Sequence, residues 1–140
     1  MAFLVIVIVI TVPLSVSAQG KKKDSGDVYA SGLKLREAEF YFTEGEKFFI
    51  LEDYAKALVY YQRALEITPE NATIHYKIAE VLSRSNKPDD LLRASFSIEN
   101  ALKLEKKNKY FYLLAANIYG SLTKFDKAAW AYETLLDEVP

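Results

Sequence analysis

The side chains of this sequence that could act as acids, bases, nucleophiles or metal ligands are few and do not converge. His75 is the only histidine and cysteine is absent, so a zinc site could combine one imidazole only with carboxylates. We therefore expect His75 to pack into a core. The sequence has no Gly-rich phosphate loop and no Ser/His/Asp set. It predicts no enzyme, no cofactor and no metal site.

Four glutamates, Glu37, Glu39, Glu44 and Glu46, lie close together in the sequence. A hydrolase with paired carboxylates needs a pocket that raises the pKa of one of the two. A charge run on a helix more often forms its solvated face, and we expect that arrangement here. Glu39 and Glu46 also fall on a stripe of the same helix that bears aromatic rings.

Asn71-Ala72-Thr73 matches the acceptor sequence for N-glycosylation. The same asparagine is well placed to cap a helix, because a short polar side chain accepts hydrogen bonds from the first free N–H groups. We expect the cap, and we expect Ser31 and Asp53 to cap two other helices.

The composition is typical of a soluble protein that folds without disulfides. Apolar residues make up 51% and charged residues 26% of the 140 positions, and the formal net charge is −1. A domain that binds nucleic acid is normally distinctly basic. Nucleic acid is therefore not an expected partner.

The N-terminal residues have the pattern of an export signal. Residues 3–14 are almost purely apolar, and Val16 and Ala18 are placed as the recognition pair of a signal peptidase site. The apolar run is shorter than the roughly 20 residues that a spanning helix needs. We predict a signal peptide at 1–18 and a flexible polar tether at 19–31.

The export signal implies a protein that is periplasmic, associated with the outer membrane, or secreted. Lys21, Lys22 and Lys23 follow the apolar run, although basic residues normally lie on its cytoplasmic side. Retention of the segment as a membrane anchor therefore stays open as an alternative to cleavage.

From residue 32 onward the sequence is organised by a repeat of about 34 residues. Pro69 and Pro140 each close a stretch in which aromatic residues and alanines recur at helical spacing. Small residues at Gly45 and Ala57 mark points where two helix backbones can approach closely, and Pro69 cannot continue a helix because it lacks the N–H group. We predict repeats at 38–71, 72–108 and 109–140. The expected helices are 32–51, 54–67, 72–85, 89–104, 108–121 and 125–138, with no sheet.

This pattern resembles the tetratricopeptide repeat family, which places an aromatic residue, Leu-Gly and Tyr on the first helix and Ala, an aromatic residue, Ala and Pro on the second. Glu44, His75, Lys106 and Leu135 depart from the pattern. The resemblance implies an all-α fold, a right-handed α-solenoid of three antiparallel helix pairs. The residues expected to form its repeat core are Tyr41, Gly45, Phe48, Ala57, Tyr61, Ala64, Pro69, Ala79, Ala94, Ala101, Tyr112, Ala116, Ala128, Tyr132 and Pro140.

In that family a second stripe on the first helices lines a concave groove for a peptide or a helix. Rings and acids stand side by side in this stripe, which suggests a partner with an apolar segment and basic residues. The stripe does not resemble the family's clamp for C-terminal carboxylates, because only Asn117 conforms to it. Alternatively, Phe42 and Phe49 are covered by the N-terminal segment at residues 28–33. The stripe comprises Glu39, Phe42, Glu46, Phe49, Tyr76, Glu80, Arg84, Tyr110, Leu113 and Asn117.

The resemblance implies a module for protein–protein interaction. Together with the export signal, it suggests a scaffold of the cell envelope that binds a protein or peptide partner in its groove. The alternative is an extracytoplasmic sensory or regulatory domain of a larger signalling protein, such as a sensor kinase. The last helix pair would expose Trp130, Leu135 and Leu136, and repeat arrays need a polar terminal helix. We therefore expect a further C-terminal part of the same chain as an additional partner.

Overall fold

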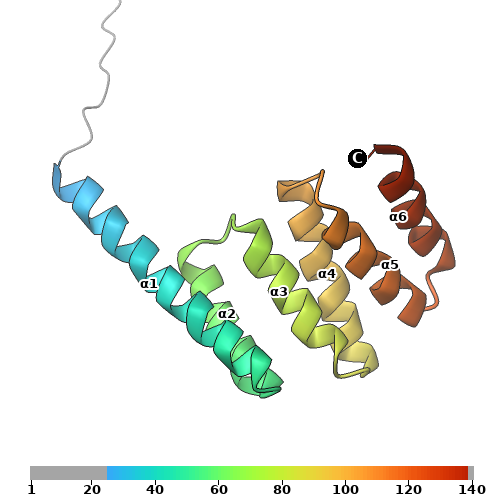
Figure 1. Cartoon of the computed structure of the whole chain (residues 1–140), viewed down its shortest axis with the longest axis horizontal. Helices are drawn as coiled ribbons and strands as arrows, with labels where there is room; N and C mark the ends of the chain where they lie inside the picture. Colours follow the sequence, from blue (N-terminus) through green and yellow to red (C-terminus); the bar gives the residue numbers. More distant parts are fainter. Residues whose placement is uncertain (1–24, 139–140) are drawn as a thin grey trace, which may run out of the picture.

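The fold is an array of six helices, seen in a computed structural model that describes residues 25–138 (Figure 1). Each odd-numbered helix packs along the helix that follows it, and α2 contacts α3 and α4 contacts α5 between the pairs. The described residues contain no strand. The predicted all-α solenoid of three helix pairs is confirmed. Its helices are α1 (Ser25–Ile50), α2 (Tyr54–Ile67), α3 (Ala72–Ser83), α4 (Pro88–Leu104), α5 (Lys109–Ser121) and α6 (Phe125–Glu138).

Three of the helix starts are fixed by side-chain caps, at Asp53, Asn71 and Asn108. The carboxylate of Asp53 accepts a hydrogen bond from the backbone N–H of Lys56 at 3.2 Å. The side-chain oxygen of Asn71 accepts one from the N–H of Ile74, also at 3.2 Å. Both residues are N-caps, as expected, because they satisfy donors that the first helical turn leaves free. Ser31 is not a cap, because it lies inside α1.

The turn inside each helix pair contains one residue in the left-handed region of the backbone. These residues are Glu52, Asn86 and Thr123, with φ values of 59°, 53° and 57°. They occupy the same position when counted from the start of each repeat. A left-handed residue is a common way to end a helix, because it turns the backbone so that free carbonyl groups find donors.

Helix α1 begins earlier than expected. Residues 25–31, predicted to be part of a flexible tether, are helical, so this part of the prediction is wrong. Asp27 lies in the first turn, where the helix dipole stabilises a negative charge. Figure 1 shows the first part of α1 extending beyond the end of α2.

The predicted signal peptide, the first residues of the tether and Pro140 lie outside the residues that the structure describes. Over residues 25–138, no helix combines the length and the apolar character that crossing a bilayer requires.

The core combines small residues at helix contacts with large rings and aliphatic chains beside them. Tyr61, Tyr119, Ile98 and Ile118 are the largest fully buried side chains. The buried residues that were expected in the repeat core are Gly45, Ala57, Tyr61, Ala64, Ala79, Ala94, Ala101, Tyr112, Ala116 and Ala128.

Three residues expected in the core do not lie there. Tyr132 is 47% exposed, because no described helix covers its side of α6, and its neighbour Ala131 is buried instead. Pro69 is exposed in the turn that follows α2. His75 is half-buried, and its ring Nε2 lies 2.9 Å from the carbonyl oxygen of Pro69, so a hydrogen bond holds the imidazole at the edge of the fold.

Tyr41 and Phe48, also expected in the core, are half-buried. Both pack on the ring of Tyr60 in α2, with centroid distances of 6.4 and 5.3 Å. Their other side is open because no described helix precedes α1 in the stack.

Gly45 is a point of close approach between α1 and α2. A Cβ atom at this position would lie 2.6 Å from the ring of Tyr61. We predict that Gly45→Ala lowers the free energy of unfolding by about 1–3 kcal/mol, because the buried ring has no room to move away. Urea denaturation followed by far-UV circular dichroism measures this change.

Gly120→Ala is the matched control. A Cβ atom at Gly120 would meet nothing within 4 Å, and alanine is the better helix former. This variant should be as stable as the parent or slightly more stable. If Gly45→Ala were also as stable as the parent, the close contact between α1 and α2 would be wrong.

Candidate functional site

The side of the array formed by α1, α3 and α5 is its inner side. Helix α5 contacts α3 as well as α4, whereas α4 and α6 make little contact. The first helices of the second and third pairs therefore lie closer together than the second helices of those pairs. A stack of this kind curves toward its first helices and offers an extended concave surface.

A hollow of about 410 Å³ lies between α3 and α5 on this inner side. We call it the inner groove. The exposed fractions of Tyr110 and Leu113 are 59% and 40%, so both can contact a partner. Tyr76 is held in place by stacking on Phe111, with ring centroids 5.1 Å apart. All stripe residues predicted on these two helices line the groove: Tyr76, Glu80, Arg84, Tyr110, Leu113 and Asn117.

A smaller hollow of about 330 Å³ lies where α1 passes the start of α3. Glu39 and Phe42, the first two residues of the predicted stripe, line this hollow. Glu39 is exposed, and its carboxylate forms no ion pair within the described part of the chain. The predicted stripe is thus divided between two hollows and is not one continuous channel.

Lys77 links α1 to α3 between the two hollows. Its Nζ atom lies 3.2 Å from Oε1 of Glu46 in α1 and 3.4 Å from Oε2 of Glu80 in its own helix. Glu80 also pairs with Arg84 at 3.8 Å, and Glu46 accepts a hydrogen bond from the hydroxyl of Tyr61. Two of the predicted groove carboxylates are therefore neutralised within the protein.

Burial and these partners shift the titration of the buried groups. Burial raises the pKa of the Tyr61 hydroxyl, and the neighbouring Glu46 carboxylate raises it further. Burial alone would lower the pKa of Lys77, but the charges of Glu80 and Glu46 outweigh it, so that this pKa is raised. Around neutral pH, Lys77 is charged and Tyr61 is a hydrogen-bond donor.

Phe42 and Phe49 are covered, but not by the segment that sequence reasoning proposed. Phe49 lies beneath two cations, with Nζ of Lys77 5.1 Å and Cζ of Arg84 5.8 Å from its ring centroid. Phe42 packs on Tyr61, with centroids 5.8 Å apart. Both rings are half-buried, and Phe42 still lines the smaller hollow. The segment proposed as their cover is itself exposed at Val28, Tyr29 and Leu33.

Sequence reasoning missed Lys77, which is the residue that decides the charge of the inner side. Its spacing of three residues before Glu80 is a signal for an ion pair within one helix. Its second partner, Glu46, is distant in the sequence, and no local pattern points to that pairing. Leu114, Ile118 and Ser121 also line the inner groove and belong to no predicted stripe.

Comparison with known protein families finds one match. Residues 45–86, from the end of α1 to the end of α3, match the family described as the TPR (tetratricopeptide) repeat. No curated protein sequence matches the chain.

The solved structures that resemble the chain in fold include three TPR domains. The TPR domain of Arabidopsis OM64 has a TM-score of 0.69 and 21% identity, and the match covers 74% of this chain and 83% of that one. The second TPR domain of Spaghetti (RPAP3), bound to the HSP90 peptide SRMEEVD, has a TM-score of 0.70 and 20% identity over 77% of this chain and 96% of that one. The first TPR domain of the same protein, with the same peptide, has a TM-score of 0.68 and 20% identity over 73% and 79%.

The position of Lys77 generates a prediction about stability and pH. We predict that Lys77→Met lowers the free energy of unfolding by about 1–2 kcal/mol at neutral pH, because Glu46 and Glu80 lose a charged partner in a half-buried site. Folding raises the pKa of Lys77. Its contribution is therefore fully present below the ordinary lysine pKa and is lost as the pH rises through the raised folded value.

Urea denaturation of parent and variant between pH 7 and about 12 measures this difference. Lys124→Met, which removes an exposed lysine, is the control and should cost little at any pH. A constant difference between Lys77→Met and the parent across that range would contradict the assigned ion pairs.

Proposed function

The chain belongs to the tetratricopeptide repeat family, and from this premise we propose that it is a non-catalytic module that binds an extended peptide in the inner groove. The observation that supports the proposal most directly is the open hollow between α3 and α5. It presents two tyrosine rings and a leucine beside the amide of Asn117. Rings offer contact area for an apolar side chain, and an amide can both donate to and accept from a peptide backbone.

The similar structures support a peptide as the occupant. Both TPR domains of Spaghetti hold a short acidic peptide of HSP90. At about 20% identity this likeness concerns the fold, so the chemistry of the occupant has to come from the residues of this chain.

Those residues favour an apolar anchor over an acidic end. Lys77, the most central cation of the inner side, is already paired with Glu46 and Glu80. A peptide carboxylate would have to displace one of them. Glu39, which lines the neighbouring smaller hollow, is the predicted stripe acid without an ion pair in the described structure. We infer a peptide with an apolar or aromatic side chain in the inner groove and a basic residue toward Glu39.

We propose that this module is located in the cell envelope. The apolar run, the small residues at Val16 and Ala18 and the polar stretch after them support export. A repeat array attached to the envelope would act as a scaffold that gathers a partner there.

Export has a direct test. When the full chain is expressed in a bacterial host, the protein recovered from the periplasm should begin at Gln19, because cleavage follows Ala18. Intact-mass measurement of the periplasmic fraction determines the N-terminus. Full-length protein retained in the cytoplasm would contradict export, and full-length protein in the membrane fraction would show that the segment is an anchor.

Peptide binding is tested with a variant that empties the inner groove. Peptides selected from a random library on the immobilised protein should bind the parent, and Tyr110→Ala/Leu113→Ala should lose about 2 kcal/mol or more of binding free energy, or roughly thirtyfold in Kd. Titration calorimetry measures both. The two side chains are largely exposed, so the fold should survive.

Phe125→Ala/Leu92→Ala is the matched control, because it removes an exposed ring and an exposed leucine elsewhere. It should keep the affinity of the parent. If the groove variant kept that affinity while the control lost it, peptide binding in the inner groove would be wrong.

A further inference from the structure

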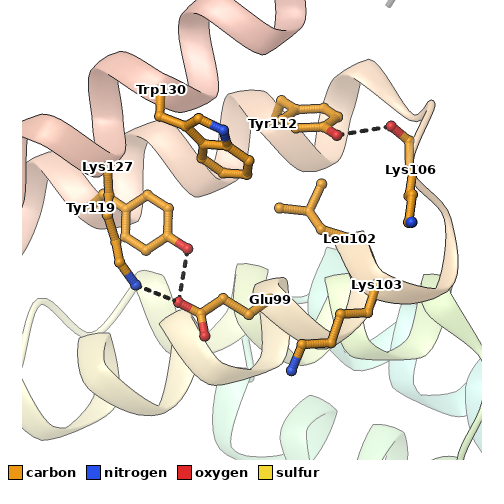
Figure 2. A pocket seen from close by; sticks show the side chains of 8 residues that line it. All are labelled: Glu99, Leu102, Lys103, Lys106, Tyr112, Tyr119, Lys127 and Trp130. Atoms are coloured by element: carbon orange, nitrogen blue, oxygen red, sulfur yellow. Dashed lines mark hydrogen bonds and ion pairs between the residues drawn. The ribbon is translucent and has the colours of Figure 1, made fainter. Parts of the chain in front are cut away.

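A second hollow, of about 490 Å³, lies on the side of α5 that faces away from the inner groove. It is bounded by α4 and α6, with Tyr112 and Tyr119 of α5 on one wall (Figure 2). These two tyrosines lie two turns apart and share one side of the helix, whereas Tyr110 and Leu113 lie on the other side. We call this hollow the outer pocket. It shares no residue with the inner groove.

Part of the outer pocket is apolar and rigid. Tyr112 and Leu102 are buried, and the ring of Tyr112 lies 5.9 Å from that of Trp130. The Tyr112 hydroxyl donates a hydrogen bond to the carbonyl of Lys106 at 2.9 Å, which fixes the ring. Trp130 is 47% exposed, and Figure 2 shows its indole directed into the hollow beside Tyr112 and Leu102. An apolar side chain that enters here meets an aromatic and aliphatic wall.

The one acid of the outer pocket is already satisfied. Oε1 of Glu99 accepts a hydrogen bond from the Tyr119 hydroxyl at 2.9 Å and lies 3.0 Å from Nζ of Lys127. The same Nζ lies over the Tyr119 ring, 5.2 Å from its centroid. Burial would raise the pKa of Glu99, but its hydrogen bonds with Lys127 and Tyr119 outweigh this, and the pKa is lowered. Glu99 therefore stays ionised and bound to its two partners.

The remaining cations of the pocket form no ion pair within residues 25–138, although the charge of Lys103 also helps to lower the pKa of Glu99. Lys103 and Lys106 line the hollow and are exposed, and neither forms an ion pair with any residue that the structure describes. Lys107 and Lys109 lie nearby in the sequence, and residues 103–109 carry four lysines against one glutamate, Glu105, for a net charge of +3. Two free ammonium groups thus stand next to the wall formed by Trp130.

From this arrangement we infer that the outer pocket is a second peptide site, which takes a short acidic segment with one branched apolar or aromatic side chain. That side chain lies against Trp130, Leu102 and Tyr112, and carboxylates on either side of it pair with Lys103 and Lys106. A hollow of about 490 Å³ accommodates one large side chain with adjoining backbone. The site is independent of the proposed function, because the two hollows lie on opposite sides of α5 and can be filled together.

Trp130 is the single tryptophan of the chain, so its fluorescence reports occupancy of this pocket directly. The probe is a blocked peptide in which one leucine is flanked on each side by two glutamates, added to the full chain at low salt. We expect a saturable change in Trp130 emission that weakens as salt is raised, because the exposed charges are screened. Peptides with glycine for leucine, or with glutamine for the glutamates, should bind about tenfold more weakly or not at all.

Two charge-matched variants locate the site. Lys103→Gln/Lys106→Gln should weaken the peptide about tenfold, whereas Lys87→Gln/Lys124→Gln, which removes two exposed lysines outside the pocket, should leave the affinity unchanged. Tyr110→Ala/Leu113→Ala should also bind the acidic peptide normally, which separates this site from the inner groove.

The inference is overturned by any of four results. These are no saturable change at millimolar peptide, equal binding of the glutamine peptide, equal effects of the two lysine pairs, or a response of Trp130 to vesicles with anionic lipids and not to the peptide.

Discussion

The helices of this array contact one another through residues that bring almost no side chain to the contact. Ala57, Ala64 and Ala79 are fully buried, as are their counterparts farther along the chain, and at Gly45 the ring of Tyr61 occupies the place of a side chain. The close approach of the backbones leaves room beside each contact for one large ring. The ring of Tyr61 fills the space beside Gly45 within the first pair, and Tyr119 reaches from α5 to Glu99 of α4 in the preceding pair.

Most charged groups on the inner side are used in contacts between the helix pairs, which leaves few of them for a partner. Glu46 and Glu80 are held by Lys77, and Lys77 with Arg84 covers Phe49. These groups stabilise the contact between the first two pairs and are not available to a ligand. The exposed apolar side chains of the inner side therefore lie toward α5, where Tyr110 and Leu113 have no such cover. A repeat protein of this size divides its first helices between holding neighbouring pairs together and contacting a partner.

Much of the architecture was predictable because the same spacing of alanines and aromatic residues recurs in each repeat. Alanines and rings in phase placed five of the six helices to within about two residues, the usual uncertainty of helix boundaries. The start of α1 was missed, because glycines and charges at residues 20–27 have the composition of a linker. The members of the inner groove were predictable from helical spacing, whereas their ion pairs were not, since Lys77 and Glu46 lie in different pairs. The outer pocket was hidden because Tyr112 and Tyr119 fit the core pattern, and because Trp130 was interpreted only as an exposed residue at the end of the array.

The length of α1 determines how far its N-terminal end lies from the body of the array. It contains 26 residues and its partner α2 contains 14, so that at 1.5 Å per residue the first helix is about 39 Å long and the second about 21 Å. Contacts with the rest of the fold begin near Leu35 and Ala38, which line the hollow beside α3. The ten residues before Leu35 form a rod of about 15 Å between the body of the array and the point where the preceding chain joins it. A structure that binds the N-terminal end of α1 would therefore lie about 15 Å from the body of the array. A small change in the angle of α1 at that end would displace the grooves by a larger distance.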